Sequence, residues 1–165
     1  MKDGKTIAIV PGSFDPITYG HIDIAKRAAE LYDVVYLAVM INSQKTYMFN
    51  IFQREAIAKE ALADISNVTV ISSEGMLWKL AEELCADAIV KGYRNKTDHE
   101  YEMKMAAFNE AHNPNAKTVL LKADKSLISL SSTAVRDRIL NNESILDCLP
   151  KAAADLVDQF ISTRS

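Results

Sequence analysis

Five short apolar runs, rich in β-branched residues, set the strongest limit on how this chain can fold. They are Thr6–Val10, Val34–Ile41, Val68–Ile71, Ala88–Val90 and Thr118–Leu121, and a segment of helical pattern separates each from the next. Strands that are apolar along their whole length are typical of parallel sheets covered by helices on both faces. The alternation therefore predicts an α/β fold built on a single doubly wound parallel sheet of five strands with right-handed crossovers.

Apolar stripes indicate which sides of the helices face the core. Stripes with the i, i+3, i+4, i+7 spacing or a close variant are Leu77, Leu80, Ala81 and Leu84; Ala153, Leu156, Val157 and Phe160; and Tyr101, Met105 and Phe108. We expect all three stripes to be buried. No repeat, low-complexity tract or linker interrupts the chain, so residues 1–165 are predicted to form a single domain.

Charge and cysteine content argue against several classes of protein. The 19 Lys and Arg against 22 Asp and Glu give a formal net charge of −3, which disfavours nonspecific binding of nucleic acid. Cys85 and Cys148 lie in apolar patterns without C-x-x-C spacing, so buried reduced thiols and a cytoplasmic chain are expected. No apolar run reaches the ~20 residues of a membrane span, and the N-terminus lacks a signal-peptide pattern, so neither a membrane nor secretion is expected.

The loop after the first predicted strand carries the clearest functional signal. It reads Pro11-Gly12-Ser13-Phe14-Asp15-Pro16-Ile17-Thr18-Tyr19-Gly20-His21 and leads into an amphipathic segment. Two glycines and two prolines shape it, with a small hydroxyl at Ser13 and an imidazole where the helix starts. Helix N-termini attract anions through free N–H groups and the positive end of the dipole. The loop therefore indicates phosphate chemistry.

Other polar residues of interest also follow predicted strands. His21 follows the first strand, Lys45 the second, Lys91–Arg94 the fourth and Ser129–Thr133 the fifth. Ligands of open α/β sheets bind beyond the carboxyl ends of strands, where the strand order reverses. Taken singly, His21 could equally be a local hydrogen-bonding group, and the lysines could be solvated surface charges.

The hydroxyl-rich segment Ser129–Thr133 precedes a predicted helix. One serine is explained as an N-cap, but the cap explains neither the additional hydroxyls nor Arg136 near the first turn. A cation there opposes the helix dipole, and a bound phosphate would remove the conflict. The pattern favours Arg136 as a phosphate contact.

Five ordered blocks resemble one known family. They are Pro-Gly-Ser-Phe-Asp-Pro, Thr18-Tyr19-Gly20-His21 with its following Ile-Asp-Ile, Lys91-Gly92-Tyr93-Arg94, Glu100-Tyr101-Glu102-Met103 and Leu130-Ser131-Ser132-Thr133. The T-x-G-H block is similar to the signature of the nucleotidyltransferases that share an ATP site with class I aminoacyl-tRNA synthetases. Together the blocks resemble the bacterial phosphopantetheine adenylyltransferase family over roughly the whole chain. The resemblance implies a Rossmann-like nucleotidyltransferase fold with strand order 3-2-1-4-5.

This resemblance also implies an activity. It is transfer of the adenylyl group of ATP to 4′-phosphopantetheine, giving dephospho-coenzyme A and pyrophosphate in coenzyme A biosynthesis. The nucleophile is the substrate's own anionic phosphate, so positioning and charge neutralisation suffice. The ATP chemistry implies Mg²⁺ held largely by phosphates and water, so no cluster of protein ligands is needed. The resemblance further implies inhibition by coenzyme A and a homohexamer.

Matching motif positions imply the role of each residue. His21 would stabilise the transition state at the ATP α-phosphate. The implied phosphopantetheine contacts are Ser13, Lys45, Leu77 and Lys91, and the implied ATP contacts are Ser13, Phe14, His21, Gly92, Tyr93, Arg94, Glu102, Leu127, Ile128, Ser129, Leu130, Ser131, Ser132, Thr133 and Arg136. Without the family, Ser13 and Phe14 would be interpreted as an ordinary turn and Glu102 as a solvated side chain.

The chain departs from the family pattern at two places. Lys91 stands where the family usually has arginine, which keeps the charge but loses the bidentate fork. The segment Leu127–Thr133 lacks the aromatic residue common in that loop. Two alternatives stay open. One is another small nucleotidyltransferase, which transfers AMP to nicotinamide mononucleotide or CMP to a phosphorylated alcohol, and the other is a flavodoxin-like binding module without catalysis.

Overall fold

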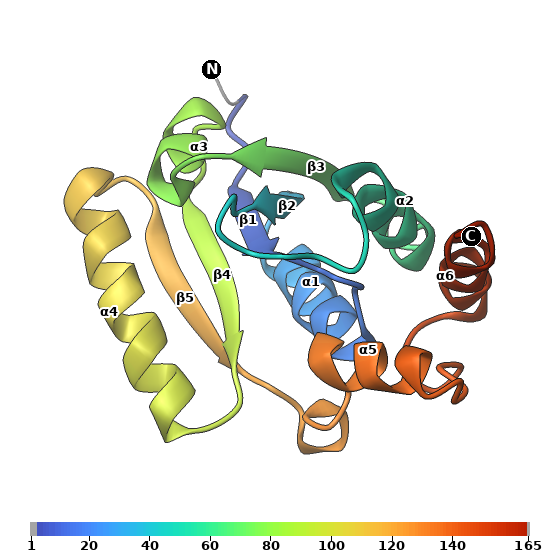
Figure 1. The fold of residues 1–165 in the computed structure, drawn as a ribbon. Helices are drawn as coiled ribbons and strands as arrows, with labels where there is room; N and C mark the ends of the chain where they lie inside the picture. The colour runs from blue at the N-terminus through green and yellow to red at the C-terminus, as the bar shows by residue number, and fades with distance from the viewer. Residues whose placement is uncertain (1–2, 165) are drawn as a thin grey trace.

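The computed structural model describes residues 3–164, and a parallel sheet forms its centre (Figure 1). The strands are β1 (Ile7–Gly12), β2 (Val34–Ile41), β3 (Val68–Glu74), β4 (Ala88–Tyr93) and β5 (Lys117–Lys122). Their order is β3-β2-β1-β4-β5, and every neighbouring pair is parallel. Each predicted run forms a strand, so the predicted fold class and strand order are confirmed.

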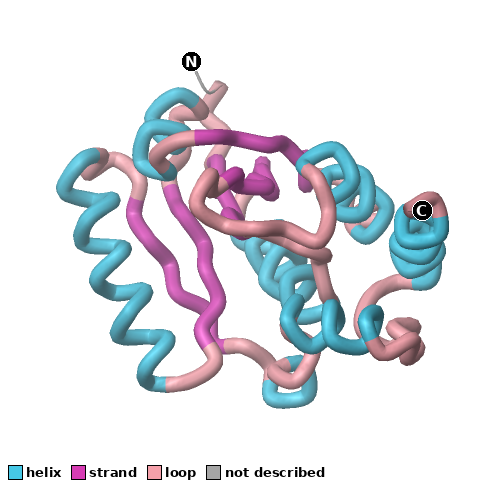
Figure 2. The backbone as a smooth tube through the Cα atoms, viewed as in Figure 1, coloured by secondary structure: helices cyan, strands magenta, loops and turns pink. Residues whose placement is uncertain are grey.

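Helices connect the strands and cover both faces of the sheet (Figures 1 and 2). They are α1 (Tyr19–Leu31), α2 (Ile51–Ala61), α3 (Leu77–Glu83), α4 (Lys96–His112), α5 (Ser132–Leu140) and α6 (Lys151–Ser162), with a 3₁₀ turn at Lys125–Leu127. Alternate residues of β1 enter two separate apolar clusters: Ala8 and Val10 pack with α1, α2, α5 and α6, whereas Ile7 and Ile9 pack with α3. Within residues 3–164, no helix has the length and apolarity needed to cross a bilayer.

The prediction that the stripe Tyr101, Met105 and Phe108 of α4 is buried is wrong for the two aromatic residues, and Met105 is half-buried. The side chains of Tyr101 and Phe108 are 60% and 42% exposed, whereas Ala106 and Asn109 are buried. α4 packs against β4 and β5, and the small side chain of Ala106 permits that close approach. The aromatic stripe therefore points away from the sheet of its own chain.

The prediction for the cysteines is half right. Cys148 is buried, but Cys85 is exposed. α3 ends at Glu83, and Cys85 adopts a φ of +53°, the left-handed conformation that commonly terminates helices. This turn ends the apolar pattern before Cys85 and directs its side chain outward.

The short pairing between β1 and β4 leaves space for a ligand between the ends of these strands. Ala8 pairs with Ala88 and Ile9 with Ile89, and the register then stops, whereas six residues of β1 pair with β2. The carboxyl ends of β1 and β4 are thus free of each other at the point where the strand order reverses. This is where an open α/β sheet binds its ligands.

Asn67 holds the connection that sets β3 beside β2. Its Nδ2 donates to the carbonyls of Ala29 at 2.9 Å and Tyr32 at 3.1 Å, which lie at the end of α1. We expect Asn67→Asp, which turns a donor into a carboxylate facing these carbonyls, to lower the free energy of unfolding by about 1–3 kcal/mol. Urea denaturation at pH 7 measures it, with Asn67→Ala as the uncharged control. An Asp variant as stable as the wild type would contradict this role.

Candidate active site

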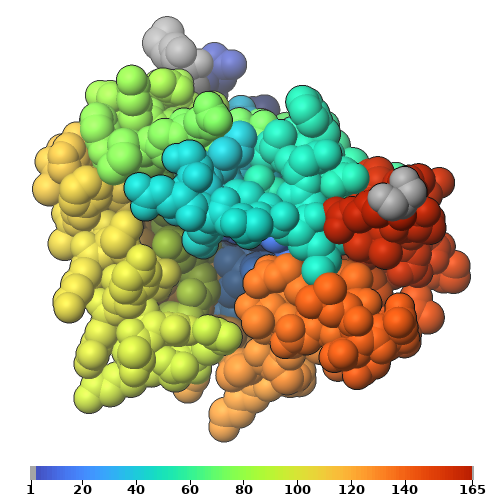
Figure 3. Space-filling model, in the orientation of Figure 1, coloured from blue at the N-terminus to red at the C-terminus, as the bar shows by residue number. Residues whose placement is uncertain are grey.

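A cavity of about 360 Å³ lies beyond the carboxyl ends of β1 and β4, and we call it the β1–β4 cleft. Its other walls are the start of α1 and the segment from Leu127 to Thr133, which leads into α5. In Figure 3, blue atoms of the N-terminal segment lie at the bottom of a hollow between the yellow-green and orange parts of the chain. Four segments far apart in the sequence therefore meet at one place.

The cleft collects most of the residues that the sequence predicts for the site. Those lining it are Phe14, His21, Lys91, Gly92, Tyr93, Arg94, Leu127, Ile128, Leu130, Ser131, Ser132 and Thr133. The predicted residues outside its lining are Ser13, Lys45, Leu77, Glu102, Ser129 and Arg136. The structure brings the first set together around one cavity, and the second set lies outside the lining of that cavity.

Local hydrogen bonds determine the tautomer of His21. Thr18 caps α1, and its backbone N–H donates to Nδ1 of His21 at 3.0 Å. A nitrogen that accepts this bond carries no proton, so the imidazole proton lies on Nε2. The side chain of Thr18 in turn accepts from the N–H of Gly20. The capping box thus leaves His21 with one N–H donor, on the nitrogen turned away from the cap.

Burial keeps this imidazole neutral. Solvent reaches part of the residue, but its ring lies among packed groups, and desolvation lowers the pKa of His21 from 6.5 to about 4. The rings of Phe14 and His21 pack edge-to-face, with their centroids 5.1 Å apart. Gly12 makes room for Phe14, because a Cβ at Gly12 would lie 2.8 Å from the Phe14 ring. At pH 7 His21 is therefore a neutral hydrogen-bond donor.

Two cations at the end of β4 are each paired with a carboxylate of α4. Lys91 Nζ lies 2.6 Å from Glu102 Oε2 as an ion pair, without the alignment of a hydrogen bond. Arg94 Nε donates to Asp98 Oδ2 at 3.0 Å. The Glu102 side chain is 14% exposed, so its interpretation as a solvated group is wrong. Asp98 also lines the cleft. It was not predicted, although Arg94 and Asp98 have the i, i+4 spacing of a helical ion pair.

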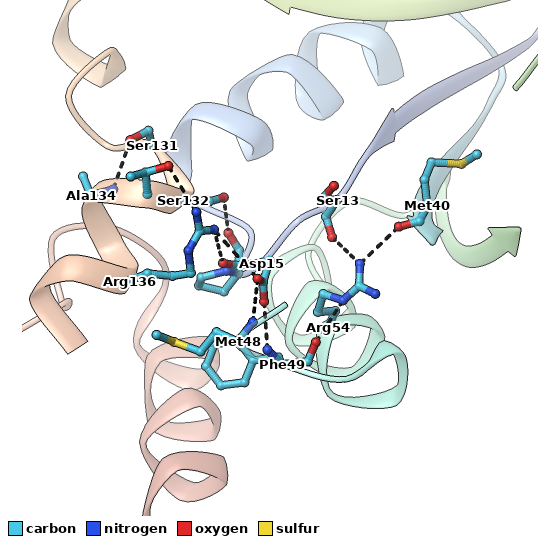
Figure 4. Close-up of polar contacts among 12 residues, drawn as sticks. Ser13, Asp15, Met40, Met48, Phe49, Arg54, Ser131, Ser132, Ala134 and Arg136 are labelled. Carbon is cyan, nitrogen blue, oxygen red and sulfur yellow. Dashed lines mark hydrogen bonds and ion pairs between the residues drawn. The ribbon is translucent and has the colours of Figure 1, made fainter. Parts of the chain in front are cut away.

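Helix α5 is tied to the loop that precedes α1 (Figure 4). Ser131 caps α5, and Ser132 Oγ donates to the carbonyl of Pro16 at 2.8 Å. Arg136 donates to the Asp15 carbonyl at 2.9 Å, and its guanidinium lies 3.8 Å from the Asp15 carboxylate. The Asp15 carboxylate thus offsets the unfavourable position of Arg136 near a helix start, without requiring a bound phosphate.

The remaining predicted residues do not line the cleft. Lys45 and Ser129 are exposed on loops, and Leu77 is half-buried at the start of α3. Ser13 lies directly after β1, and its carbonyl accepts a hydrogen bond from Arg54, a buried residue of α2. Arg54, Asp15 and Thr18 had no predicted role. Only the T-x-G-H spacing of Thr18 carried a signal that could have found one of them.

Comparison with known proteins agrees with this geometry. The family model described as cytidylyltransferase-like matches residues 9–138. A phosphopantetheine adenylyltransferase of Lactobacillus acidophilus is 41% identical over 150 residues, which cover 90% of this chain and 93% of that protein. One of Caldanaerobacter subterraneus is 40% identical over 155 residues, with coverage of 93% and 97%. The chain belongs to the phosphopantetheine adenylyltransferase family.

Solved structures agree on the fold. A protein of Vibrio parahaemolyticus described as a candidate nicotinate-nucleotide adenylyltransferase superposes with a TM-score of 0.70 at 18% identity, covering 94% of this chain and 93% of that one. A lipopolysaccharide core biosynthesis protein of Thermoplasma volcanium superposes with a TM-score of 0.57 at 22% identity, covering 74% and 100%. The phosphopantetheine adenylyltransferase family thus shares this nucleotidyltransferase architecture with proteins of distant sequence.

The lowered pKa of His21 predicts a pH-dependent contribution to stability. Between pH 6.5 and about 4 the unfolded chain binds a proton at this position that the folded chain does not. The stability due to neutral His21 is therefore complete above pH 6.5 and is lost as the pH falls toward 4. As the pH falls over this range, we expect the unfolding free energy of the wild type to decrease more than that of His21→Gln, as measured by urea denaturation. A difference that does not vary with pH would refute the buried, neutral imidazole.

Proposed function

We propose that this chain transfers the adenylyl group of ATP to 4′-phosphopantetheine, releasing pyrophosphate and dephospho-coenzyme A in coenzyme A biosynthesis. The observation that carries the proposal is the neutral Nε2–H donor of His21, held at a helix start in a cleft lined by Lys91 and Arg94. Relatives 38–41% identical to this chain bear the name of this activity. They favour it over the other nucleotidyltransferases and over a flavodoxin-like module.

The reaction requires one displacement at phosphorus. An oxygen of the phosphopantetheine phosphate forms a bond to the α-phosphorus of ATP, and the bond from that phosphorus to the bridging oxygen of the β-phosphate breaks. Pyrophosphate leaves with the electron pair. Because the attacking oxygen is already anionic, no general base is needed, and His21 acts by donating a hydrogen bond as charge builds on the α-phosphate oxygens.

The metal ion expected for this reaction is Mg²⁺. Among residues 3–164, no three His, Cys, Asp or Glu side chains are grouped so that they could hold a metal ion. We therefore assign no step to a metal held by the protein. We propose that Mg²⁺ enters with ATP, bound by phosphate oxygens and water, since magnesium keeps several waters and needs few protein ligands.

Family membership supports further proposals about this protein. We propose that it acts in the cytoplasm as a homohexamer and that coenzyme A, which combines parts of both substrates, inhibits it from the same cleft. The exposed aromatic stripe of α4, with Tyr101 at 60% and Phe108 at 42%, offers apolar surface for assembly. Light scattering during gel filtration and calorimetric competition between coenzyme A and ATP test these two points.

The motifs also imply which residues contact each substrate. We propose that Ser13, Lys45, Leu77 and Lys91 contact phosphopantetheine. We propose that the ATP contacts are the residues given above for that substrate, from Ser13 and Phe14 to Arg136. The support is that most of these residues line the cleft beyond the carboxyl ends of β1 and β4.

Pyrophosphate release tests the activity and the role of His21 together. With ATP, we expect release with phosphopantetheine and none with nicotinamide mononucleotide or glycerol 3-phosphate. His21→Ala should lower kcat by about 10²–10³ with little change in the KM for ATP, because the lost donor acts mainly in the transition state. His112→Ala, which alters an exposed histidine of α4, is the matched control. A His21→Ala enzyme with near-normal kcat and a raised KM would rule out this role.

Lys91 provides a second test at the position where the chain departs from its family. Lys91→Ala should raise the KM for phosphopantetheine or ATP, since a charge-assisted hydrogen bond contributes about 1.5–3 kcal/mol. Lys91→Arg should bind at least as well as the wild type, because a planar fork grips two phosphate oxygens. Lys151→Ala, which removes an exposed lysine of α6 that is paired with Asp155 and does not line the cleft, is the control. Unchanged kinetics in both Lys91 variants would make it a structural ion-pair partner only.

A further inference from the structure

Arg54 is a buried cation without an acidic partner. It lies on α2, is 2% exposed, and is among the largest fully buried side chains of the protein. Among the ion pairs formed within residues 3–164, none includes Arg54. Burying a charge is costly unless hydrogen bonds compensate it. An apolar residue would fill the same space at lower cost, so the charge at this position calls for an explanation.

Backbone carbonyls take the place of a counterion. Arg54 Nε donates to the carbonyl of Phe49 at 3.1 Å, and Nη1 donates to those of Ser13 at 2.8 Å and Met40 at 3.1 Å. Figure 4 shows one guanidinium reaching all three segments. They are the turn after β1, the end of β2 and the residue before the cap of α2. A guanidinium suits this task because its donors form a rigid planar fork.

The face of the guanidinium holds the loop that carries Lys45. The ring of Tyr47 lies over Arg54 with its centroid 3.8 Å from Cζ, which is cation–π distance. The hydroxyl of Tyr47 accepts a hydrogen bond from the N–H of Asn42 at 3.0 Å. That bond closes residues 42–47 into a loop, with the exposed Lys45 on it.

We infer that Arg54 is a positioning residue for the phosphopantetheine side of the site. It holds the Ser13 turn and the Lys45 loop in a fixed relation, through the Ser13 carbonyl and the Tyr47 ring. This inference rests on the proposed function, which makes Ser13 and Lys45 substrate contacts. Arg54 itself does not line the cleft and acts through these neighbours.

The experiment compares the two Michaelis constants in variants that loosen the arrangement. Arg54→Met keeps the bulk but removes the charge and all three hydrogen bonds, and should raise the KM for phosphopantetheine by about 10-fold to 100-fold. The fold increase in the KM for ATP should be at least threefold smaller than that for phosphopantetheine, because Lys45 is proposed to contact only phosphopantetheine. Arg54→Lys, which keeps the charge without the fork, should restore part of the affinity.

Substitutions at Tyr47 test the same inference without altering the buried cation. Tyr47→Leu removes the ring over Arg54 and should raise the KM for phosphopantetheine selectively. Tyr47→Phe keeps the ring, loses only the bond to Asn42, and should stay closer to the wild type. This pair decides the question if Arg54→Met does not fold, as judged by circular dichroism.

Two outcomes separate this inference from the proposed function. A wild type that releases no pyrophosphate from ATP with phosphopantetheine overturns both. An active wild type whose folded Arg54 and Tyr47 variants keep both KM values within twofold, even with a lowered melting temperature, overturns the inference alone. In that case the buried guanidinium serves only stability.

Discussion

The buried carboxylate of Asp15 is the contact on which the cleft depends. It is 3% exposed and accepts hydrogen bonds from the backbone N–H groups of Met48 and Phe49, each at 2.9 Å. The backbone carbonyl of Asp15 accepts a hydrogen bond from the guanidinium of Arg136 on α5. Charge-assisted bonds of this kind are stronger than neutral ones, and an unpaired carboxylate at this depth would be severely destabilising. The turn after β1, the residues before α2 and the first turn of α5 are therefore held as one unit.

The sequence was sufficient for the sheet and for the position of the cleft, but not for this unit. Continuous apolar runs identify parallel strands, and the rule that ligands bind at their carboxyl ends predicted that His21, Lys91 and Arg94 lie at one place, as they do in the lining of the β1–β4 cleft. Asp15 and Arg54 escaped assignment because their side chains bond mainly to backbone groups, 33 and 34 residues away for Asp15 and 5, 14 and 41 residues away for Arg54. Backbone partners leave no pattern of residue types, so the sequence could not indicate these contacts.

Helix α4 shows a second limit of sequence patterns. Periodicity detects that a helix has an apolar side, but not which surface that side meets. Here the sheet is met by Ala106 and Asn109, while Tyr101 and Phe108 remain exposed. The same packing turns Glu102 inward, where its carboxylate meets Lys91 at 2.6 Å. The error about the helix face therefore hid the ion pair of Glu102 with Lys91 and the apolar surface that supports our proposal of assembly.

The charges of the cleft divide binding from catalysis. Lys91 and Arg94 are held by Glu102 and Asp98, so their side chains are oriented by the fold. Fixed cations attract a polyanionic substrate before and during reaction alike, and such uniform attraction lowers KM more than it raises kcat. His21 differs, because with a pKa of about 4 it carries no charge at neutral pH and offers one oriented N–H. A neutral donor gains most where charge builds up, so in the mechanism we propose His21 discriminates between ground state and transition state, and its capping box sets its direction before any substrate arrives.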